Sequence, residues 1–385
     1  MIHTLAVFGY RSLRDLVLPL DQLTVVTGAN GVGKSSLYRA LRLLCETAEG
    51  NLARALAAEG GLPSTLWAGP ETISREMREG LQPVQGTRRK APVALKLGFS
   101  SDDFGYAVDM GLPIPVGGSR FNADPEIKSE AVWAGQHLKR TNVLAERRRS
   151  LLRVRDENGH WTDLTKRIPG FDSMLGFGVD PRTAPELIEL RERMRNWRFY
   201  DDLRVDREAA VRQPQVSIRT PVLSSSGHDL AAAIETIREI GDHRGFAETI
   251  DDAFPETSVK AVMSGDATMV VEMSQHGLLR PLRASELSDG TLRFLMLAAA
   301  LHTPRPPELL VLNEPESSLH PDLIAPLSRL IGKAATRSQV IVITHNRPMA
   351  NALCEEGALS HELVKTLGET EVPAAEKLPW KWPDR

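Results

Sequence analysis

The sequence predicts an α/β fold with a mixed β-sheet, an antiparallel β subdomain and an α+β insertion. Three observations predict it. An apolar run, LTVVTG from Leu23, leads through a glycine-rich turn into a helical stretch. Two stretches that alternate apolar and polar residues, APVALKLGFS and FGYAVDMG, favour an antiparallel pair. In the last third of the chain helices alternate with buried strands, which is typical of a largely parallel sheet.

Composition limits the class of protein. With 385 residues, 42% of them hydrophobic, the chain can bury a sizeable core as one elaborated domain or as two or three domains. The net charge of -3 excludes binding of nucleic acid by the whole surface, so such binding needs a local basic patch. Cys45 and Cys354 have no CxxC or histidine-rich spacing, which argues against a disulfide framework or a zinc site.

The amino terminus carries charges where a secretion signal needs an apolar core, and no segment approaches the roughly eighteen apolar residues of a membrane span. We therefore expect a soluble protein of the reducing cytoplasm with no membrane partner.

The amino-terminal part should contain strands at about Ile2–Phe8 and Leu16–Leu20, a third strand from Leu23, and a helix over residues 34–56, KSSLYRALRLLCETAEGNLARAL. The stretches APVALKLGFS and FGYAVDMG follow, joined by SDD.

Residues 119–227 are interrupted by glycine, proline and arginine, and we interpret them as an insertion. They should hold a hairpin in LLRVRDENGHWTDL and a charged helix in PELIELRERMRNWRFYDDL. The segment is too short and too poor in heptads for a long coiled-coil arm. The predicted organisation is a head formed by residues 1–118 and 228–385, with residues 119–227 inserted between its two sequence motifs.

The remaining elements follow in order. A helix is expected in SSSGHDLAAAIETIREI, then two strands around SGDA and SQHG turns. ELSDGTLRFLMLAAALH should form a helix, ELLVLNE a buried strand, DLIAPLSRLIGKAA a helix and SQVIVITHN another buried strand.

A phosphate-binding motif lies between the strand from Leu23 and the helix after it. TVVTGANGVGKSSLYRAL contains GxxxxGKS at Gly28, Gly33, Lys34 and Ser35. Glycines let the backbone turn its N–H groups inward, and the helix amino terminus adds its dipole. Lys34 supplies a positive charge to the outer phosphates, and Ser35 offers a hydroxyl to magnesium. The strand and helix on either side disfavour a simple glycine turn with an exposed lysine. The predicted nucleotide-binding residues also include the rest of the loop and its exit: Ala29, Asn30, Gly31, Val32 and Ser36.

A second group of motifs lies near the other end. Leu-Ser-Asp-Gly in ELSDGTLRF begins an apolar helix and alone could be an ordinary capping turn. It is followed by LLVLNEPE and IVITHN. With this order of motifs, and with the opening LAVFGYRSLRDLVLPLDQLTVVTG, the chain resembles the ABC-type ATPase superfamily. It is most similar to its soluble branch of SMC, RecF and OLD-like proteins, which includes predicted AAA family ATPases. The resemblance covers residues 1–44 and 283–350 and says little about the middle.

The resemblance implies a P-loop ABC-type ATPase head that binds ATP and Mg²⁺. Two heads would form a homodimer with ATP sandwiched between them, so that Ser288 and Gly290 face the phosphate held by Lys34 of a second copy. Glu314 would polarise the attacking water, and His345 would contact the γ-phosphate. The segment SSLHP, residues 317–321, would cross the interface.

Other implied roles stay open. The family's glutamine that senses the γ-phosphate could be Gln82, Gln85 or Gln136. Arg11 in YRS resembles a basic residue that reaches the nucleotide in some relatives, and a solvated turn arginine is the alternative.

Asn313 stands where most relatives have an aspartate that holds magnesium through water. An amide oxygen accepts the same hydrogen bond without a charge, so Ser35 and Asn313 should bind the metal less firmly. We expect slow hydrolysis with a raised magnesium requirement, because the general base Glu314 is retained.

The leading hypothesis is an ATPase that dimerises on ATP to act on nucleic acid or a partner protein, in genome maintenance or phage defence. The alternative is an ATP-gated clamp or sensor with little turnover. A transporter subunit is disfavoured, because the signature reads LSDGT and EPESSLHP departs from the transporter pattern.

Several basic clusters suggest that the protein binds nucleic acid, either DNA or RNA. The alternative is that these clusters are ordinary solvated surface charge. The clusters are Arg88 to Lys90, Lys139–Arg140, Arg147 to Arg149 and RERMRNWRF, with Trp197 and Phe199 interleaved in the last. No nuclease pattern follows the second buried strand, so nucleolysis would need a separate effector protein. Trp380 and Trp382 in the tail are expected to pack on the domain.

Overall fold

The computed structural model describes residues 1–71, 74–78, 81–82, 92–156, 158–164, 167–177, 180–373 and 378–385. Gln85 and the cluster from Arg88 to Lys90 lie outside the described residues. The chain forms two compact units. Unit 1 consists of Met1–Asp21, Gly28–Trp197 and His361–Arg385, and unit 2 of Gln22–Thr27 and Arg198–Ser360. The division into head and insertion follows the order of the motifs rather than compactness, and it stays a prediction.

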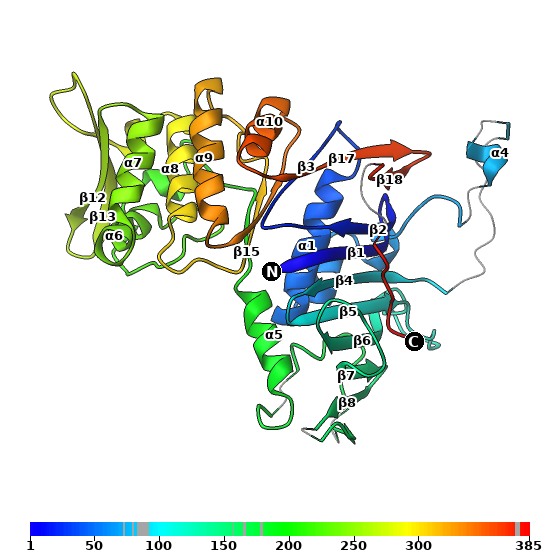
Figure 1. Ribbon diagram of the computed structural model, residues 1–385. Helices are drawn as coiled ribbons and strands as arrows, with labels where there is room; N and C mark the ends of the chain where they lie inside the picture. The colour runs from blue at the N-terminus through cyan, green and yellow to red at the C-terminus, as the bar shows by residue number, and fades with distance from the viewer. Residues whose placement is uncertain are drawn as a thin grey trace. The chain divides into compact units, whose positions relative to one another are not determined.

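Unit 1 is built on an antiparallel sheet with strand order β2-β1-β4-β5-β6-β7-β8-β9 (Figure 1). Its strands are β1 (Ile2–Tyr10), β2 (Leu13–Pro19), β4 (Leu95–Ser101), β5 (Phe104–Gly111), β6 (Glu126–Ala134), β7 (Val143–Arg148), β8 (Leu151–Arg155) and β9 (Trp161–Asp163). The predicted pairing of β4 with β5 and the predicted hairpin of β8 and β9 are confirmed. The segment interpreted as an insertion contributes β6 to β9 to the same sheet.

Helices of unit 1 pack beside this sheet. They are α1 (Lys34–Glu49), α2 (Leu52–Ala58), α3 (Leu62–Thr65), α4 (Arg75–Arg78) and α5 (Pro185–Arg195), and α1 contacts β1, β4 and α5. The prediction of one helix over residues 34–56 is wrong. Gly50 ends α1 with a φ of 76°, a left-handed conformation that glycine adopts without strain, and α2 begins two residues later.

The tail of the chain packs on the antiparallel sheet, as predicted for its tryptophans. The rings of Trp380 and Trp133 meet edge to face with centroids 5.8 Å apart. Arg385 makes two hydrogen bonds of 2.7 Å to the fully buried carboxylate of Asp109. Before the tail, β17 (Leu359–Thr366) and β18 (Glu369–Glu371) form an antiparallel hairpin that the sequence analysis did not predict.

Unit 2 contains the predicted parallel strands. β10 (Arg198–Tyr200), β15 (Leu309–Asn313), β16 (Gln339–Ile343) and β3 (Leu23–Gly28) pair in parallel in that order. β15 and β16 are buried almost throughout, which explains their continuous apolar sequences.

The prediction of one helix through PELIELRERMRNWRFYDDL is wrong after Arg195. The helix ends there, and Arg198–Tyr200 becomes strand β10. Aromatic residues favour strands, and pairing with the buried strand β15 overrides the local helical pattern. Trp197 and Phe199 are only 4% and 6% exposed, so they are not available to stack on nucleic acid.

The other predicted elements of unit 2 are present. The predicted helices are α6 (Leu230–Ile240), α8 (Asp289–Leu301) and α9 (Ile324–Ala335). Two helices, α7 (His243–Ala253) and α10 (Arg347–Glu355), were not predicted, and short 3-10 turns lie at Ala210–Arg212, Ala284–Glu286 and Pro321–Leu323. Its remaining strands are β11 (Gln215–Val216), β12 (Thr257–Gly265), β13 (Thr268–Gln275) and β14 (Leu282–Arg283). Apolar faces of α6, α8 and α9 share one core, and Figure 1 shows α7, α8 and α9 side by side.

Two further expectations can be compared with the described residues. Cys45, buried in α1, and Cys354, exposed in α10, are both free thiols. In the described part of the chain no helix combines the length and the apolar character that a bilayer span requires.

A buried ion pair fixes the outer strands of unit 1. Glu130 and Arg147 are both fully buried, with Arg147 Nη1 3.1 Å from Glu130 Oε2. Tyr106 and Ser173 donate hydroxyl hydrogen bonds of 2.7 and 2.6 Å to the same carboxylate. Arg147 also donates to the carbonyl oxygens of Pro169 and Asp172. The first residue of the predicted basic cluster from Arg147 to Arg149 is therefore structural and cannot contact nucleic acid.

We predict that Arg147→Met lowers the free energy of unfolding by about 3 to 5 kcal/mol, because it leaves the Glu130 carboxylate buried without its cation. The matched control is Arg148→Met on the same strand, whose exposed side chain lies 3.7 Å from Glu146 and whose loss should cost less than about 1 kcal/mol. Urea unfolding followed by tryptophan fluorescence measures both. Equal losses for the two variants would contradict the structural role of the buried pair.

Candidate functional site

The phosphate loop depends on two glycines in unit 1. Gly28 and Gly33 have φ values of 145° and 114°, which residues with a side chain rarely adopt. A Cβ atom on Gly28 would lie 2.6 Å from the carbonyl oxygen of Leu363, and one on Gly33 would lie 2.4 Å from Thr370 Oγ1. Neither position has room for any other residue, so these motif glycines are required by the backbone and its surroundings.

The β17–β18 hairpin holds this loop in shape. The Thr370 hydroxyl donates a hydrogen bond of 2.6 Å to the carbonyl oxygen of Val32, and its oxygen lies 2.8 Å from the Ser12 hydroxyl, which can donate to it. Lys365 Nζ donates to the carbonyl oxygen of Gly31 at 3.1 Å. The loop is thus tied to the hairpin at two points.

The loop presents the groups that a phosphate needs. Helix α1 begins at Lys34 with no side-chain cap and no acidic residue in its first turn, so its amino-terminal N–H groups and dipole are available to an anion. Lys34 Nζ donates to the carbonyl oxygens of Gly28 and Ala29 at 2.7 and 2.9 Å. Asn30 is exposed, as is Ser35 in the first turn. A nucleotide with magnesium at Ser35 fits this cradle.

Arg11 is engaged elsewhere in unit 1. Its Nη2 donates to Glu59 Oε2 at 2.7 Å, and Tyr10 donates its hydroxyl to the same oxygen at 2.6 Å. Burial, with a smaller contribution from the Glu59 hydrogen bond, raises the pKa of Tyr10 above its usual value. The structure therefore favours a structural role for Arg11, and its nucleotide contact stays a prediction. Gln82 and Gln136 are both exposed and remain the two candidates within the described residues.

In unit 2 the predicted catalytic pair meets at the carboxyl ends of adjacent parallel strands. Glu314 follows β15, and His345 follows β16 by two residues. Glu314 Oε1 lies 3.0 Å from His345 Nδ1, and both side chains are about half exposed. The Glu314 N–H donates to the carbonyl oxygen of Ile343 at 2.7 Å, and Glu314 has a φ of 49°. Such a conformation is uncommon for a non-glycine residue and directs the side chain out of the strand.

Two further side chains, Glu316 and Arg293, support this pair, and neither was predicted. Glu316 is 6% exposed and accepts a hydrogen bond from the Thr344 hydroxyl. Burial raises the pKa of Glu316, and the hydrogen bond from Thr344 acts in the opposite direction. Arg293 of α8 donates to the carbonyl oxygen of Glu314 at 3.3 Å. Two features of the sequence could have indicated these residues: an arginine inside an apolar helix, and a second glutamate two residues after Glu314.

Two aspartates extend the polar edge of the sheet. Asp201 and Asp202 directly follow β10, whose Tyr200 is in register with Leu312 of β15, so Asp201 continues the chain beside Asn313. Burial lowers the pKa of Arg293, and the negative charges of both aspartates act in the opposite direction. Their place at this sheet edge was not predicted, because the stretch that contains them was expected to be helical.

Asn313 is the only predicted metal ligand of unit 2. Over the described residues, no group of three or more histidine, cysteine, aspartate and glutamate side chains could hold a metal ion. The assignment of Ser35 and Asn313 as magnesium ligands stays a prediction.

The predicted signature residues lie at the exposed start of α8. Ser288 is the N-cap, and its Oγ accepts a hydrogen bond of 3.1 Å from the Thr291 N–H. A Cβ atom on Gly290 would lie 2.8 Å from the carbonyl oxygen of Ser318, so a residue without a side chain is needed there. This contact joins α8 to the turn that follows Glu314. The start of α8 and the predicted catalytic pair therefore form one local structure within unit 2.

Comparison with solved structures shows the fold. The structure of an SMC head bound to the C-terminal winged-helix domain of ScpA matches 96% of this chain and 97% of its own, with a TM-score of 0.52 and 15% identity. An SMC head domain with a coiled coil and joint from Pyrococcus yayanosii has a TM-score of 0.49 and 11% identity, over 96% of both chains. One from Pyrococcus furiosus with an extended coiled coil, bound to the C-terminal domain of ScpA, has a TM-score of 0.48 and 15% identity, covering 96% of this chain and 95% of its own.

A comparison with curated proteins gave no significant match. The profile of one protein family matches residues 23–348, a range that begins at β3 and includes the phosphate loop, the start of α8, Glu314 and His345. An ABC-type, SMC-like P-loop ATPase fold was the prediction, and the SMC head structure with a TM-score of 0.52 confirms that fold. The chain belongs to the AAA domain family described as putative AbiEii toxin, type IV toxin–antitoxin system.

Proposed function

We propose that the chain binds ATP at its phosphate loop and hydrolyses it with Glu314 as the general base. The observation that supports this most strongly is the glycine cradle of unit 1, in which Gly28 and Gly33 occupy positions that admit no side chain at the start of α1. Such a cradle at a helix amino terminus is suited to phosphate, and Lys34 supplies the positive charge for the outer phosphates.

The catalytic half of the proposal rests on unit 2. Glu314 is accessible, its position is fixed by its backbone hydrogen bond to Ile343, and its carboxylate lies beside His345. Glu314 accepts a proton from the attacking water, and His345 orients that carboxylate and contacts the γ-phosphate. Ser35 and Asn313 would hold magnesium, which would neutralise charge on the phosphates. The neutral amide of Asn313 makes this metal site weaker than one with an aspartate, and turnover is accordingly slow.

We further propose that ATP joins two copies of the chain. Ser288 at the exposed start of α8 would face the phosphates bound to the loop of a second copy. Support comes from the chemistry of this helix end: its N-cap is exposed, Gly290 in its first turn has no side chain, and its dipole favours an anion. The negative charge of Asp289 in the same turn is paired with Arg212.

Closing and opening of this dimer would act on nucleic acid or on a partner protein. The relative with the TM-score of 0.52 was solved with part of ScpA bound, which supports a protein partner for a head of this fold. The alternative, an ATP-gated clamp or sensor with little turnover, is favoured by the missing charge at Asn313. Comparing the single-turnover rate with the lifetime of the dimer separates the two functions.

Glu314→Gln should lower the rate of ATP hydrolysis by about 10² to 10⁴, because the base is lost while the phosphate loop is unchanged. Phosphate release at saturating ATP and equilibrium binding of a fluorescent ATP analogue give the two readouts. Lys34→Ala is the control that should lose binding as well as hydrolysis. Hydrolysis by Glu314→Gln at the rate of the unchanged protein would overturn the role of Glu314.

Asn313→Asp should lower the magnesium concentration that gives half-maximal hydrolysis by about fivefold, corresponding to about 1 kcal/mol from one added charge near the metal. Asn313→Ala, which removes the oxygen ligand, should raise that concentration. Magnesium titrations of the steady-state rate measure both changes. If the aspartate and alanine variants shift the titration in the same direction, Asn313 does not take part in holding the metal.

Glu314→Gln should also form a dimer with ATP and magnesium, and adding Ser288→Arg should prevent that dimer while ATP still binds. The arginine would meet the partner's bound phosphates and loop with a side chain too large for the interface. Ser264→Arg, at the exposed end of β12, is the matched control and should leave the dimer intact. Light scattering with size exclusion reports the mass, and a dimer that persists in the Ser288→Arg protein would argue against this interface.

A further inference from the structure

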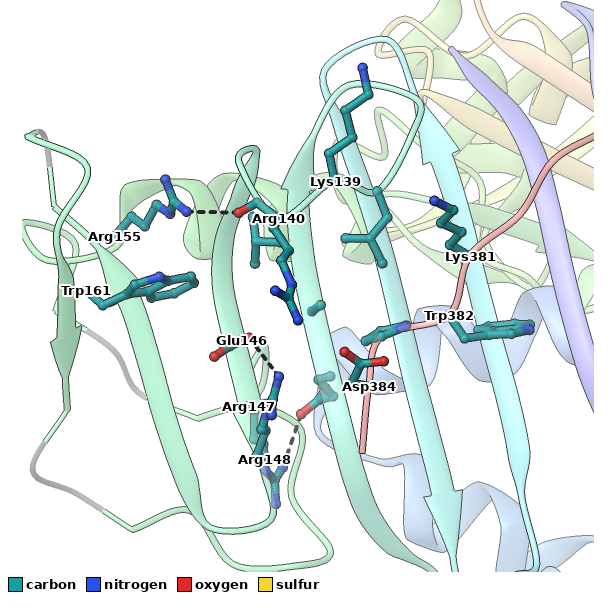
Figure 2. Close-up of a pocket in the computed structure, with 15 residues that line it drawn as sticks. Lys139, Arg140, Glu146, Arg147, Arg148, Arg155, Trp161, Lys381, Trp382 and Asp384 are labelled. Carbon is teal, nitrogen blue, oxygen red and sulfur yellow. Dashed lines mark hydrogen bonds and ion pairs between the residues drawn. The ribbon is translucent and has the colours of Figure 1, made fainter. Parts of the chain in front are cut away.

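A cavity of about 650 Å³ lies on the outer strands of the antiparallel sheet of unit 1, with the tail of the chain along one side (Figure 2). Its walls come from β6, β7 and β8, the loop before β7, Trp161 of β9 and residues 381–384. This volume lies within the range of small-molecule sites in proteins. We call it the basic pocket, after its five cationic lining residues other than the buried Arg147: Lys139, Arg140, Arg148, Arg155 and Lys381.

The basic pocket carries excess positive charge. At its floor Glu130 and Arg147 neutralise each other. Of the two remaining acidic side chains, Glu146 is paired with arginines and Asp384 lies on the tail. By contrast, Lys139, Arg140 and Lys381 are exposed and have no carboxylate partner within the described ranges. Cations left without partners around a cavity attract an anion such as a phosphate.

The pocket also offers a flat aromatic surface. Figure 2 shows the Trp161 ring extending toward Arg140, whose guanidinium reaches into the cavity. Arg153 and Arg155 each lie 5.0 Å from the centre of the Trp161 ring. The ring of Trp382 points away from the cavity in Figure 2, and the Nζ atom of Lys96 lies 5.7 Å from the centre of that ring. Because two guanidinium groups already lie over the Trp161 ring, a planar ligand that stacks on this ring takes the place of the Arg153 guanidinium.

The walls of the pocket are held in place before any ligand binds. Arg155 donates to the carbonyl oxygens of Arg140 and Thr141 at 2.9 and 3.3 Å. The Nε of Arg155 is buried and has no hydrogen-bond partner in the part of the chain described here. On the other side, the ion pair of Arg385 with buried Asp109 anchors the tail beside the cavity. A preformed site loses less entropy on binding than a flexible surface does.

We propose that the basic pocket binds a nucleotide unit, with its phosphate on Arg140 and Lys381 and its base stacked on Trp161. The unit comes either from a single strand of DNA or from a free nucleotide. This inference extends the proposed action on nucleic acid, and it uses none of the residues of the phosphate loop.

The test uses the full chain carrying Lys34→Ala, without ATP, so that a failure of this inference is distinguishable from a failure of ATP binding. The probe is a fluorescently labelled oligothymidylate of twenty nucleotides, and binding is measured by anisotropy as the salt concentration is varied. Trp161→Ala should weaken binding about tenfold, because stacking of one base contributes about 1 to 3 kcal/mol. Trp161→Phe should restore most of the affinity.

The charged wall is tested separately. Changing Arg140 and Lys381 together to glutamine should weaken binding and reduce the slope of log affinity against log salt by about 0.7, the value for one phosphate contact on a single strand. Arg207→Gln, an exposed arginine of unit 2, is the control and should change neither quantity.

Thymidine monophosphate as competitor distinguishes the sources of the ligand. Displacement of the probe by micromolar monophosphate indicates a free nucleotide, and displacement only by unlabelled oligonucleotide indicates a DNA strand. Either result supports the inference. The inference is overturned if the folded Trp161→Ala and Arg140→Gln/Lys381→Gln proteins bind the oligonucleotide as the unchanged chain does. It is also overturned if a polyglutamate peptide binds as tightly as the oligonucleotide and its binding is insensitive to Trp161→Ala.

Discussion

The parallel register of β10, β15, β16 and β3 is the constraint on which the proposed chemistry depends. Pairing sets Tyr200 beside Leu312, Asn313 beside Ile343, and Ile343 beside Val26. Because parallel strands end at the same edge of a sheet, the residues that follow them lie close together in space even when they are far apart in the sequence. Glu314 and His345 thereby lie 3.0 Å apart although 31 positions separate them. A shift of one strand by one residue would remove that contact.

The phosphate loop is constrained in a different way. Its backbone is shaped by what surrounds it, because the β17–β18 hairpin occupies the space that side chains at positions 28 and 33 would need. Thr370 then ties the loop to the turn that contains Ser12. The sheet edge that carries Glu314 and His345 therefore depends on strand register, whereas the loop depends on close packing against a hairpin from the far end of the chain.

Motifs whose chemistry is local could be predicted from sequence. The glycine loop, the signature turn and the buried strands each carry their signal within a few adjacent residues, and the family and fold were predicted from them. Features that depend on distant partners could not be predicted. Arg147 looks like part of an exposed basic cluster until Glu130 is known to be its buried partner. Asp201 and Asp202 looked helical because the pairing of β10 with β15 is not visible locally, and Thr370 stands in a hairpin with no motif.

The central claim is that each ATP is held by the loop of one copy and the start of α8 of another. Mixing Lys34→Ala and Ser288→Arg proteins, each inactive alone, tests it most directly. Because neither variant forms the ATP dimer with itself, only mixed dimers assemble, each with one intact composite site out of two, so hydrolysis should recover to as much as about half of the unchanged rate. If each chain instead carries a complete site of its own, mixing restores nothing, and the composite site is contradicted.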